Sequence, residues 1–147
     1  MPGGPRATTA TMISCLGYRD ADAAVAWLCR AFGFEEHAIY RGEDGKVVHA
    51  ELKFGNGMIM LGPDGGGDFG KRFMTQPERA GGRCTQTVYV IVGDANAHHA
   101  RALAAGAEII MPLKDEDYGG SGYSARDPEG HCWTFGTYDP WLQVARS

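Results

Sequence analysis

Residues 126–135, which read RDPEGHCWTF, constrain the architecture more than any other segment of the chain. The tetrapeptide Asp-Pro-Glu-Gly within it is typical of a tight turn, because proline fixes one backbone angle and glycine tolerates a positive one. After the turn, Trp133 and Phe135 alternate with smaller side chains. This alternation predicts a strand at 132–136 whose large residues face a core and whose small residues face the opposite side.

Upstream of this turn, the apolar residues change from strand to helix periodicity and back again. We predict strands at 84–92, 107–113 and 123–126, with a helix at 95–105. Asp94 is placed to cap the start of that helix, and Gly106 follows its end, where glycine is favoured. The second half of the chain therefore has the order βαβββ.

The first half of the chain repeats this order. We predict strands at 11–18, 34–40, 47–54 and 58–62, and a helix that is capped by Asp20 and ends at Gly33. Asp20 recurs as Asp94 after 74 residues, and Gly33 recurs as Gly106 after 73 residues. This shared spacing indicates that the chain contains two copies of one unit.

Two such units define the predicted fold. We expect one domain, in which module one spans 11–62, a glycine-rich linker spans 63–83 and module two spans 84–138. A βαβββ unit leaves one face of its sheet uncovered, so that pairing two units is the economical arrangement. The prediction is an α+β fold whose curved mixed sheets form a cup, with the helices on the outer face.

Composition excludes several classes of function. The 147 residues are 44% hydrophobic and 22% charged, with a formal net charge of −4 and a pI near 5.7. No cluster of Lys and Arg provides the basic face that nucleic acids require, and no apolar run approaches the ~20 residues that span a bilayer. We expect a cytoplasmic protein with no nucleic-acid partner and no membrane partner.

The four cysteines are widely spaced and contain no C-x-x-C pair, which is not the pattern of a structural zinc site. We expect reduced, mostly buried thiols, because cytosolic chains rarely keep disulfides. A disulfide or a reactive thiol is the alternative. The cysteines are Cys15, Cys29, Cys84 and Cys132.

The chain resembles the vicinal oxygen chelate superfamily, which includes glyoxalase I, extradiol dioxygenases and bleomycin-resistance proteins. The resemblance covers about Met12 to Tyr138 and is sharpest in the turn and strand at 126–135. The strands at 48–52 and 58–61 are similar to the PhnB-like or bleomycin-resistance-like branch. Further segments that carry the resemblance are Ala31-Phe32-Gly33-Phe34, Val92-Gly93-Asp94 and Ala104-Ala105-Gly106-Ala107.

The resemblance also implies a place for a metal ion. The family's metalloenzymes carry one ligand on the first strand and one on the fourth strand of each half. These positions correspond here to Ile13, Met60, Thr87 and Thr134. A divalent ion needs anionic or imidazole ligands to repay its dehydration, which Ile and Met cannot supply and Thr supplies poorly. We expect neither a metal ion nor another cofactor.

Polar candidates for ligand contact lie on the strand at 47–54. His49, Glu51 and Lys53 share one face of this strand, opposite the apolar residues, and should face the cup. An imidazole and a carboxylate at this spacing can orient a polar ligand, act as acid and base, or bind a metal weakly. Alternatively, they form a solvated or ion-paired surface.

Softer side chains complete the predicted lining of the cup. Tyr89 lies two residues beyond Thr87 on the same strand face, and Met60 and Thr134 occupy equivalent points of the two halves. Methionine and tyrosine suit a flat or amphipathic organic ligand better than a phosphate or a chelated diol. The alternative is that these residues fill a small core.

The remaining polar residues give weaker predictions. Tyr123 and Arg126 should lie near the cup, where Arg126 contacts an anionic ligand or else pairs with Asp127 or Glu129. His131 is expected to cap its turn. His98 and His99, on the helix at 95–105, are both expected at the surface.

Three functions are consistent with these features. The leading hypothesis is a metal-free protein of the bleomycin-resistance type that binds a small organic ligand, either a drug-like compound or a metabolite. The alternative is a lyase, isomerase or dioxygenase of the vicinal oxygen chelate type, which works through a metal ion. A third is a structural or regulatory domain whose own side chains fill the cup. We also expect a homodimer, because members of the family commonly complete their cups across a two-fold interface.

Overall fold

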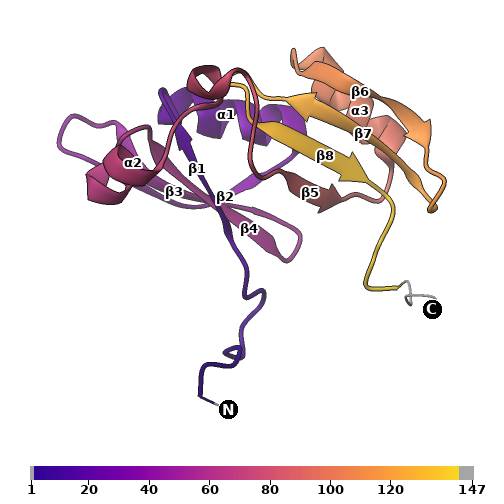
Figure 1. Cartoon of the computed structure of the whole chain (residues 1–147), viewed down its shortest axis with the longest axis horizontal. Helices are drawn as coiled ribbons and strands as arrows, with labels where there is room; N and C mark the ends of the chain where they lie inside the picture. Colours follow the sequence, from indigo (N-terminus) through magenta and orange to yellow (C-terminus); the bar gives the residue numbers. More distant parts are fainter. Residues whose placement is uncertain (1, 143–147) are drawn as a thin grey trace.

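The computed structural model describes residues 2–142, which form two βαβββ modules with one four-stranded sheet each (Figure 1). This confirms the predicted α+β class. Module one contains β1 (Ser14–Tyr18), α1 (Ala21–Phe32), β2 (Glu35–Arg41), β3 (Val47–Phe54) and β4 (Gly57–Pro63). Module two contains β5 (Val88–Ile91), α3 (Ala95–Ala104), β6 (Glu108–Asp115), β7 (Ser121–Arg126) and β8 (Cys132–Gly136).

The segment between the modules contains two short helices that the sequence analysis did not predict. They are α2 (Gly67–Phe73) and the 3-10 helix η1 (Pro77–Ala80). None of the residues of α2 is buried, and Phe69 and Phe73 remain largely exposed. Only Phe69 and Phe73, which lie four residues apart, give this seven-residue helix an apolar face, and such a short pattern does not predict a helix.

The two sheets have the same mixed topology. Their strand orders are β1-β4-β3-β2 and β5-β8-β7-β6. In each sheet the first and fourth strands of the module run parallel, whereas the other pairs are antiparallel. We call the side of each sheet that faces away from α1 and α3 its open face.

The helix boundaries follow the predicted caps. The Asp20 side chain accepts a hydrogen bond of 3.0 Å from Ala23 N, and Asp94 accepts an equivalent bond from Ala97 N. Gly33 ends α1 in the left-handed region, with φ of 83°. These residues satisfy backbone groups that a helix leaves free at its ends, which confirms the caps predicted from the sequence.

The two modules share one hydrophobic core. Trp133 and Phe135 of β8 are fully buried, as the alternation around the turn predicted. Phe32, at the end of α1, packs on both of these rings, with ring centroids 5.5 Å and 4.5 Å apart. The Trp27 indole N–H donates a 2.9 Å hydrogen bond to the Ala105 carbonyl. The helix of module one is thus anchored on the sheet and helix of module two.

His98 does not lie at the surface, contrary to expectation. One of its ring nitrogens is 2.6 Å from the Tyr123 hydroxyl, and the other is 2.8 Å from the Phe32 carbonyl oxygen. Tyr123 is itself 2% exposed, and its hydroxyl lies on the helix side against His98, although the residue also borders a cavity over the open face, near the predicted cup. The alanine-rich helix leaves room beside it for His98 and Tyr123, and the bond from His98 to Phe32 links module two to module one.

The turn at 127–130 also joins the modules. Asp127 is buried and accepts hydrogen bonds from the Tyr18 hydroxyl at 2.6 Å and the Trp133 indole at 3.1 Å. Burial and the neighbouring Asp127 carboxylate raise the pKa of Tyr18. The backbone N–H of His131 donates a hydrogen bond to Asp127 within the turn. Its ring does not cap the turn but lies 2.8 Å from the Gly17 carbonyl oxygen of module one.

No helix within residues 2–142 is long and apolar enough to cross a membrane.

Candidate functional site

A row of paired residues crosses the open face of each sheet. In module one, the strand register places Cys15 beside Met60, Met60 beside Glu51, and Glu51 beside Ala38. The corresponding row in module two is Tyr89, Thr134, Ser124 and Met111. Corresponding members are separated by 74 or 73 residues, so the internal repeat predicted from the helix caps extends to the open faces.

His49 and Glu51 form a polar pair on the open face of the first sheet. His49 Nε2 lies 3.0 Å from Glu51 Oε2, and both side chains are partly exposed. The Tyr40 ring lies beside the imidazole, with centroids 5.7 Å apart. The structure therefore brings the two predicted residues together and places Glu51 next to Met60, across the β3–β4 ladder.

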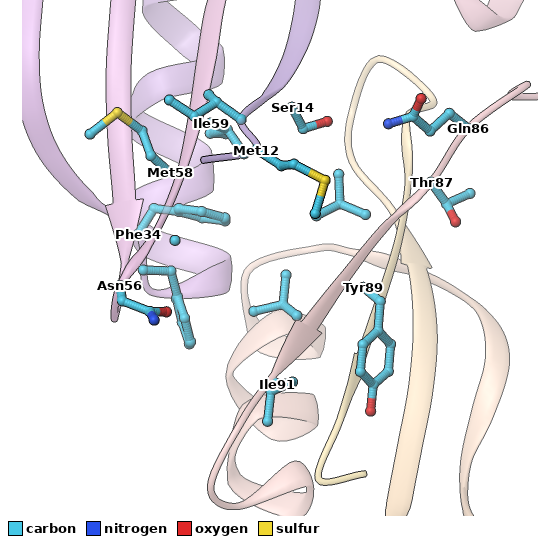
Figure 2. Close-up of a pocket in the computed structure, with 15 residues that line it drawn as sticks. Met12, Ser14, Phe34, Asn56, Met58, Ile59, Gln86, Thr87, Tyr89 and Ile91 are labelled. Atoms are coloured by element: carbon cyan, nitrogen blue, oxygen red, sulfur yellow. The ribbon is translucent and has the colours of Figure 1, made fainter. Parts of the chain in front are cut away.

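A cavity of about 400 Å³ lies at the seam between the two modules (Figure 2). Met12 reaches into it from the segment before β1, and it is also lined by Thr87, just before β5, and by Tyr89 of β5. Two of the predicted ligand-binding residues, Thr87 and Tyr89, thus contact this cavity. Other residues that line this cavity are Ile13, Ser14, Phe34, Phe54, Asn56, Met58, Ile59, Gln86 and Ile91.

A second cavity, of about 220 Å³, lies over the open face of module two. Tyr89 and Thr134 both line it, as does Ser124, whose hydroxyl lies 2.7 Å from that of Thr134. The predicted residues therefore form two groups. One group lies on the sheet of module one and consists of His49, Glu51 and Met60. The other lies on module two and consists of Thr87, just before β5, Tyr89 of β5 and Thr134 of β8.

Arg126 has partners that the sequence analysis did not consider. Its guanidinium donates a hydrogen bond of 2.8 Å to Glu108 and one of 3.3 Å to the Gly82 carbonyl. The ion pair with Glu108 raises the pKa of Arg126. Neither predicted partner, Asp127 nor Glu129, makes these contacts, because Asp127 points into the core and Glu129 bonds to the backbone of Arg19 and Asp20.

The metal ion that the fold family implies does not fit the side chains at the inherited positions. Met60 lies directly beside Cys15, and Thr134 lies directly beside Tyr89. Ile13 and Thr87 precede those partners by two residues and therefore share their face. Neither set offers the imidazole and carboxylate ligands of a divalent centre. Within residues 2–142, no group of three or more His, Cys, Asp and Glu side chains is arranged to hold a metal ion.

The cysteines are free but less buried than expected. Cys15 is exposed, and Cys29, Cys84 and Cys132 are partly buried. Burial, and then the neighbouring Cys84, raise the pKa of the Cys132 thiol. The prediction of mostly buried thiols is therefore wrong for Cys15, which lies on the open face of an edge strand.

Sequence reasoning missed two residues that lie beside the second cavity. Tyr118, in the turn before β7, and Tyr138, just after β8, both line it. The run Tyr-Gly-Gly-Ser-Gly at 118–122 is typical of a turn and gives no sign of a site. The position of Tyr138, beyond the last predicted strand, gave no indication that its ring returns to the sheet.

Comparisons with known proteins agree with this architecture. Residues 10–135 match the Glyoxalase/Bleomycin resistance protein/Dioxygenase superfamily. An uncharacterized protein of Mycobacterium tuberculosis is 35% identical over 117 residues, which cover 80% of this chain and 68% of the relative. The chain therefore belongs to the Glyoxalase/Bleomycin resistance protein/Dioxygenase superfamily.

Solved structures show the same fold. The crystal structure of TioX from Micromonospora sp. ML1 is 35% identical, has a TM-score of 0.67, and aligns with 85% of this chain and 95% of its own. A family enzyme from Burkholderia phytofirmans PsJN aligns with a TM-score of 0.68 at 19% identity, over 84% of this chain and 94% of its own. A lactoylglutathione lyase from Agrobacterium tumefaciens aligns with a TM-score of 0.58 at 20% identity, over 89% of this chain and 95% of its own.

Proposed function

We propose that this protein binds a small organic molecule on the open faces of its sheets and does so without a metal ion. The observation that carries the proposal is the chemistry of the two rows that cross those faces. Their central positions hold Met60 and Thr134, flanked by Cys15 and Tyr89. Polarizable and weakly polar side chains of this kind favour apolar or aromatic ligands, and His49 or Glu51 is available for a polar end.

We further propose that the binding unit is a homodimer. Several large apolar side chains on or near the open faces are exposed, including Ile13, Tyr89 and Met111, which are 38%, 38% and 52% exposed. A monomer rarely keeps so much apolar surface in contact with water without a partner or ligand. A second copy would bring one sheet of each chain toward the other and join the two groups of predicted site residues.

The alternative is a metal-dependent lyase, isomerase or dioxygenase of the vicinal oxygen chelate type. It requires ligands other than the side chains at the inherited positions, and the His49–Glu51 pair supplies only two. Metal-free binding is therefore favoured by the donor set. A domain whose cup is filled by its own side chains is less consistent with the cavities of about 400 Å³ and 220 Å³ beside these faces.

Native mass spectrometry of the purified full-length protein, combined with elemental analysis, tests the proposal. We expect a dimer that carries organic adducts or takes up apolar aromatic compounds, with no stoichiometric transition metal. Stoichiometric zinc, nickel, manganese or iron that is lost when Glu51 is replaced by Gln would contradict metal-free binding. The Glu36→Gln variant, which changes an exposed carboxylate of β2, is the matched control.

A further inference from the structure

Three tyrosine rings meet at the edge of the open face of module two. Tyr89 comes from β5, Tyr118 from the turn between β6 and β7, and Tyr138 from the segment after β8. Together with Pro140 they line a shallow depression that is open to solvent, with a volume of about 390 Å³. The rings of Tyr118 and Tyr138 are in a T-shaped arrangement with centroids 4.8 Å apart. Segments that are distant in sequence therefore build one aromatic cluster, which we call the tyrosine cage.

Local backbone geometry holds the tyrosine cage in place. The Tyr89 hydroxyl donates a 2.7 Å hydrogen bond to the Tyr138 carbonyl oxygen. Gly136 lies beneath the Tyr89 ring, because a Cβ atom added there would approach the Tyr89 hydroxyl oxygen to 2.8 Å. Gly120, with φ of 74°, packs equally closely on the backbone of Tyr138. These two glycines permit an approach of ring and backbone that other residues would block.

The charges around the tyrosine cage are mainly acidic. Burial raises the pKa of Tyr89, and the charges of Asp139 and Glu116 raise it further. Burial and Glu116 also raise the pKa of Tyr118. Both rings therefore stay neutral near pH 7 and keep the negative electrostatic potential of their faces. Lys114 is a basic side chain that lines the adjoining cavity, together with Glu116.

We propose that the tyrosine cage binds a small organic cation, such as a quaternary ammonium group or a protonated amine. Aromatic faces attract a cation within about 6 Å of the ring centroid, and carboxylates nearby add a favourable long-range field. An anionic ligand would be disfavoured by Glu116, which lines the adjoining cavity, and by Asp139, which follows Tyr138 in the chain. The acidic surroundings thus select the cation among the groups that fit an aromatic pocket.

This inference rests on the proposed function and names the chemistry of one end of the ligand. Tyr89 lines the tyrosine cage, the cavity over Thr134 and the cavity at the seam between the modules. A ligand with its cationic group among the tyrosines can therefore extend its apolar body over the open face, toward Thr134 and Ser124. The ligand class is an amphipathic molecule with one cationic end.

Choline and its uncharged isostere 3,3-dimethylbutan-1-ol are suitable probes, because they differ in charge but little in shape. Nuclear magnetic resonance titration of the full-length protein should show binding of choline, with shifts of tyrosine ring signals, and weaker binding of the alcohol. Replacing one exposed wall of the cage, in Tyr118→Leu, should weaken choline binding about fivefold. The control Tyr40→Leu removes a similarly exposed tyrosine from module one and should leave choline binding unchanged.

Equal affinity for choline and the alcohol, or unchanged choline binding in Tyr118→Leu, would overturn the cation site. Folding is not at issue in these variants, since Tyr118 and Tyr40 are 57% and 54% exposed. Neither of these outcomes affects the more general proposal, which organic adducts in native mass spectrometry test separately. If native mass spectrometry detects no organic adducts while choline still binds to the tyrosine cage, the general proposal fails and the cation site stands.

Discussion

The Tyr18 hydroxyl of the first module donates a 2.6 Å hydrogen bond to the Asp127 carboxylate of the second. The same carboxylate accepts bonds from the Trp133 indole and from the backbone N–H groups of Glu129 and His131. One buried side chain therefore organises the turn at 127–130 and ties it to the strand that precedes α1. The turn motif, which served as a fold marker in the sequence, acts as a junction between modules.

Replacing Asp127 with Ala should destabilise the protein substantially. Two buried donors, the Tyr18 hydroxyl and the Trp133 indole, would lose their acceptor, and each unsatisfied group costs about 1–3 kcal/mol. We expect a free energy of unfolding lower by about 2–5 kcal/mol, measured by urea denaturation. The exposed Asp117→Ala variant should change stability by less than about 0.5 kcal/mol. An equal, small effect in both variants would show that the junction contributes little.

Met60→Trp tests whether the open face of module one is ligand space or packed core. Met60 lies on this face, so that a larger side chain should block a ligand while the fold remains intact. Leu61, its neighbour on the helix side, is 2% exposed, and Leu61→Trp should cost about 1–3 kcal/mol by overpacking. Thermal unfolding and adduct detection distinguish the two variants. Similar destabilisation by both, with ligand binding retained in Met60→Trp, would identify the face as core.

A mixing experiment determines whether the binding site is shared between chains. If a ligand contacts Met60 of one chain and Thr134 of its partner, the single variants Met60→Trp and Thr134→Trp each block both sites of a dimer. A heterodimer of these two variants would then contain one site with both substitutions and one site with neither. We expect co-refolded mixtures to regain binding in proportion to the heterodimer fraction. Mixtures without any binding would place the site within one chain.

The stability of the protein should decrease in mildly acidic solution because of His98. Burial lowers the pKa of His98 below its ordinary value of 6.5, although the Phe32 carbonyl partly opposes this shift. The unfolded chain therefore binds more protons as the pH falls below about 6.5, and stability is lost from there down to the folded-state pKa. Chemical denaturation at a series of pH values should show this dependence.

The variant His98→Leu should lose that pH dependence, although it also removes two hydrogen bonds and is expected to be less stable at every pH. His37→Gln, which changes an exposed histidine of β2, should keep the dependence of the parent protein. A slope that persists in His98→Leu would assign the effect to other groups.

Local signals in the sequence were sufficient for the strands and helices of the two modules and for the repeat, but not for α2 and η1 between them. Asp20, Asp94 and Gly33 act within a few residues of their own positions, so that their roles follow from helix geometry alone. The alternation of Trp133 and Phe135 likewise identified a core face. These features fixed the order of strands and the two-module architecture without any knowledge of distant contacts.

Contacts between distant residues were not predictable in the same way. His98 bonds to Phe32, and His131 bonds to Gly17, across separations of 66 and 114 residues. Nothing in the local pattern of α3 distinguishes His98 from a solvated histidine. For the same reason, the tyrosine cage was recognised only in part. Tyr89 was expected in the cup, whereas Tyr118 and Tyr138 lie in segments without periodicity.

The two rows of paired residues on the open faces differ in chemistry, so that the two ends of the candidate site are not equivalent. An identical duplication would present the same groups at both ends, and a bound molecule could be turned around without loss. Here one sheet presents the thiol of Cys15, the thioether of Met60 and the carboxylate of Glu51 in a row, whereas the other presents the ring of Tyr89 and the hydroxyl groups of Thr134 and Ser124. If the proposed ligand has two unlike ends, these rows would hold it in a single orientation, even though the two sheets have the same topology.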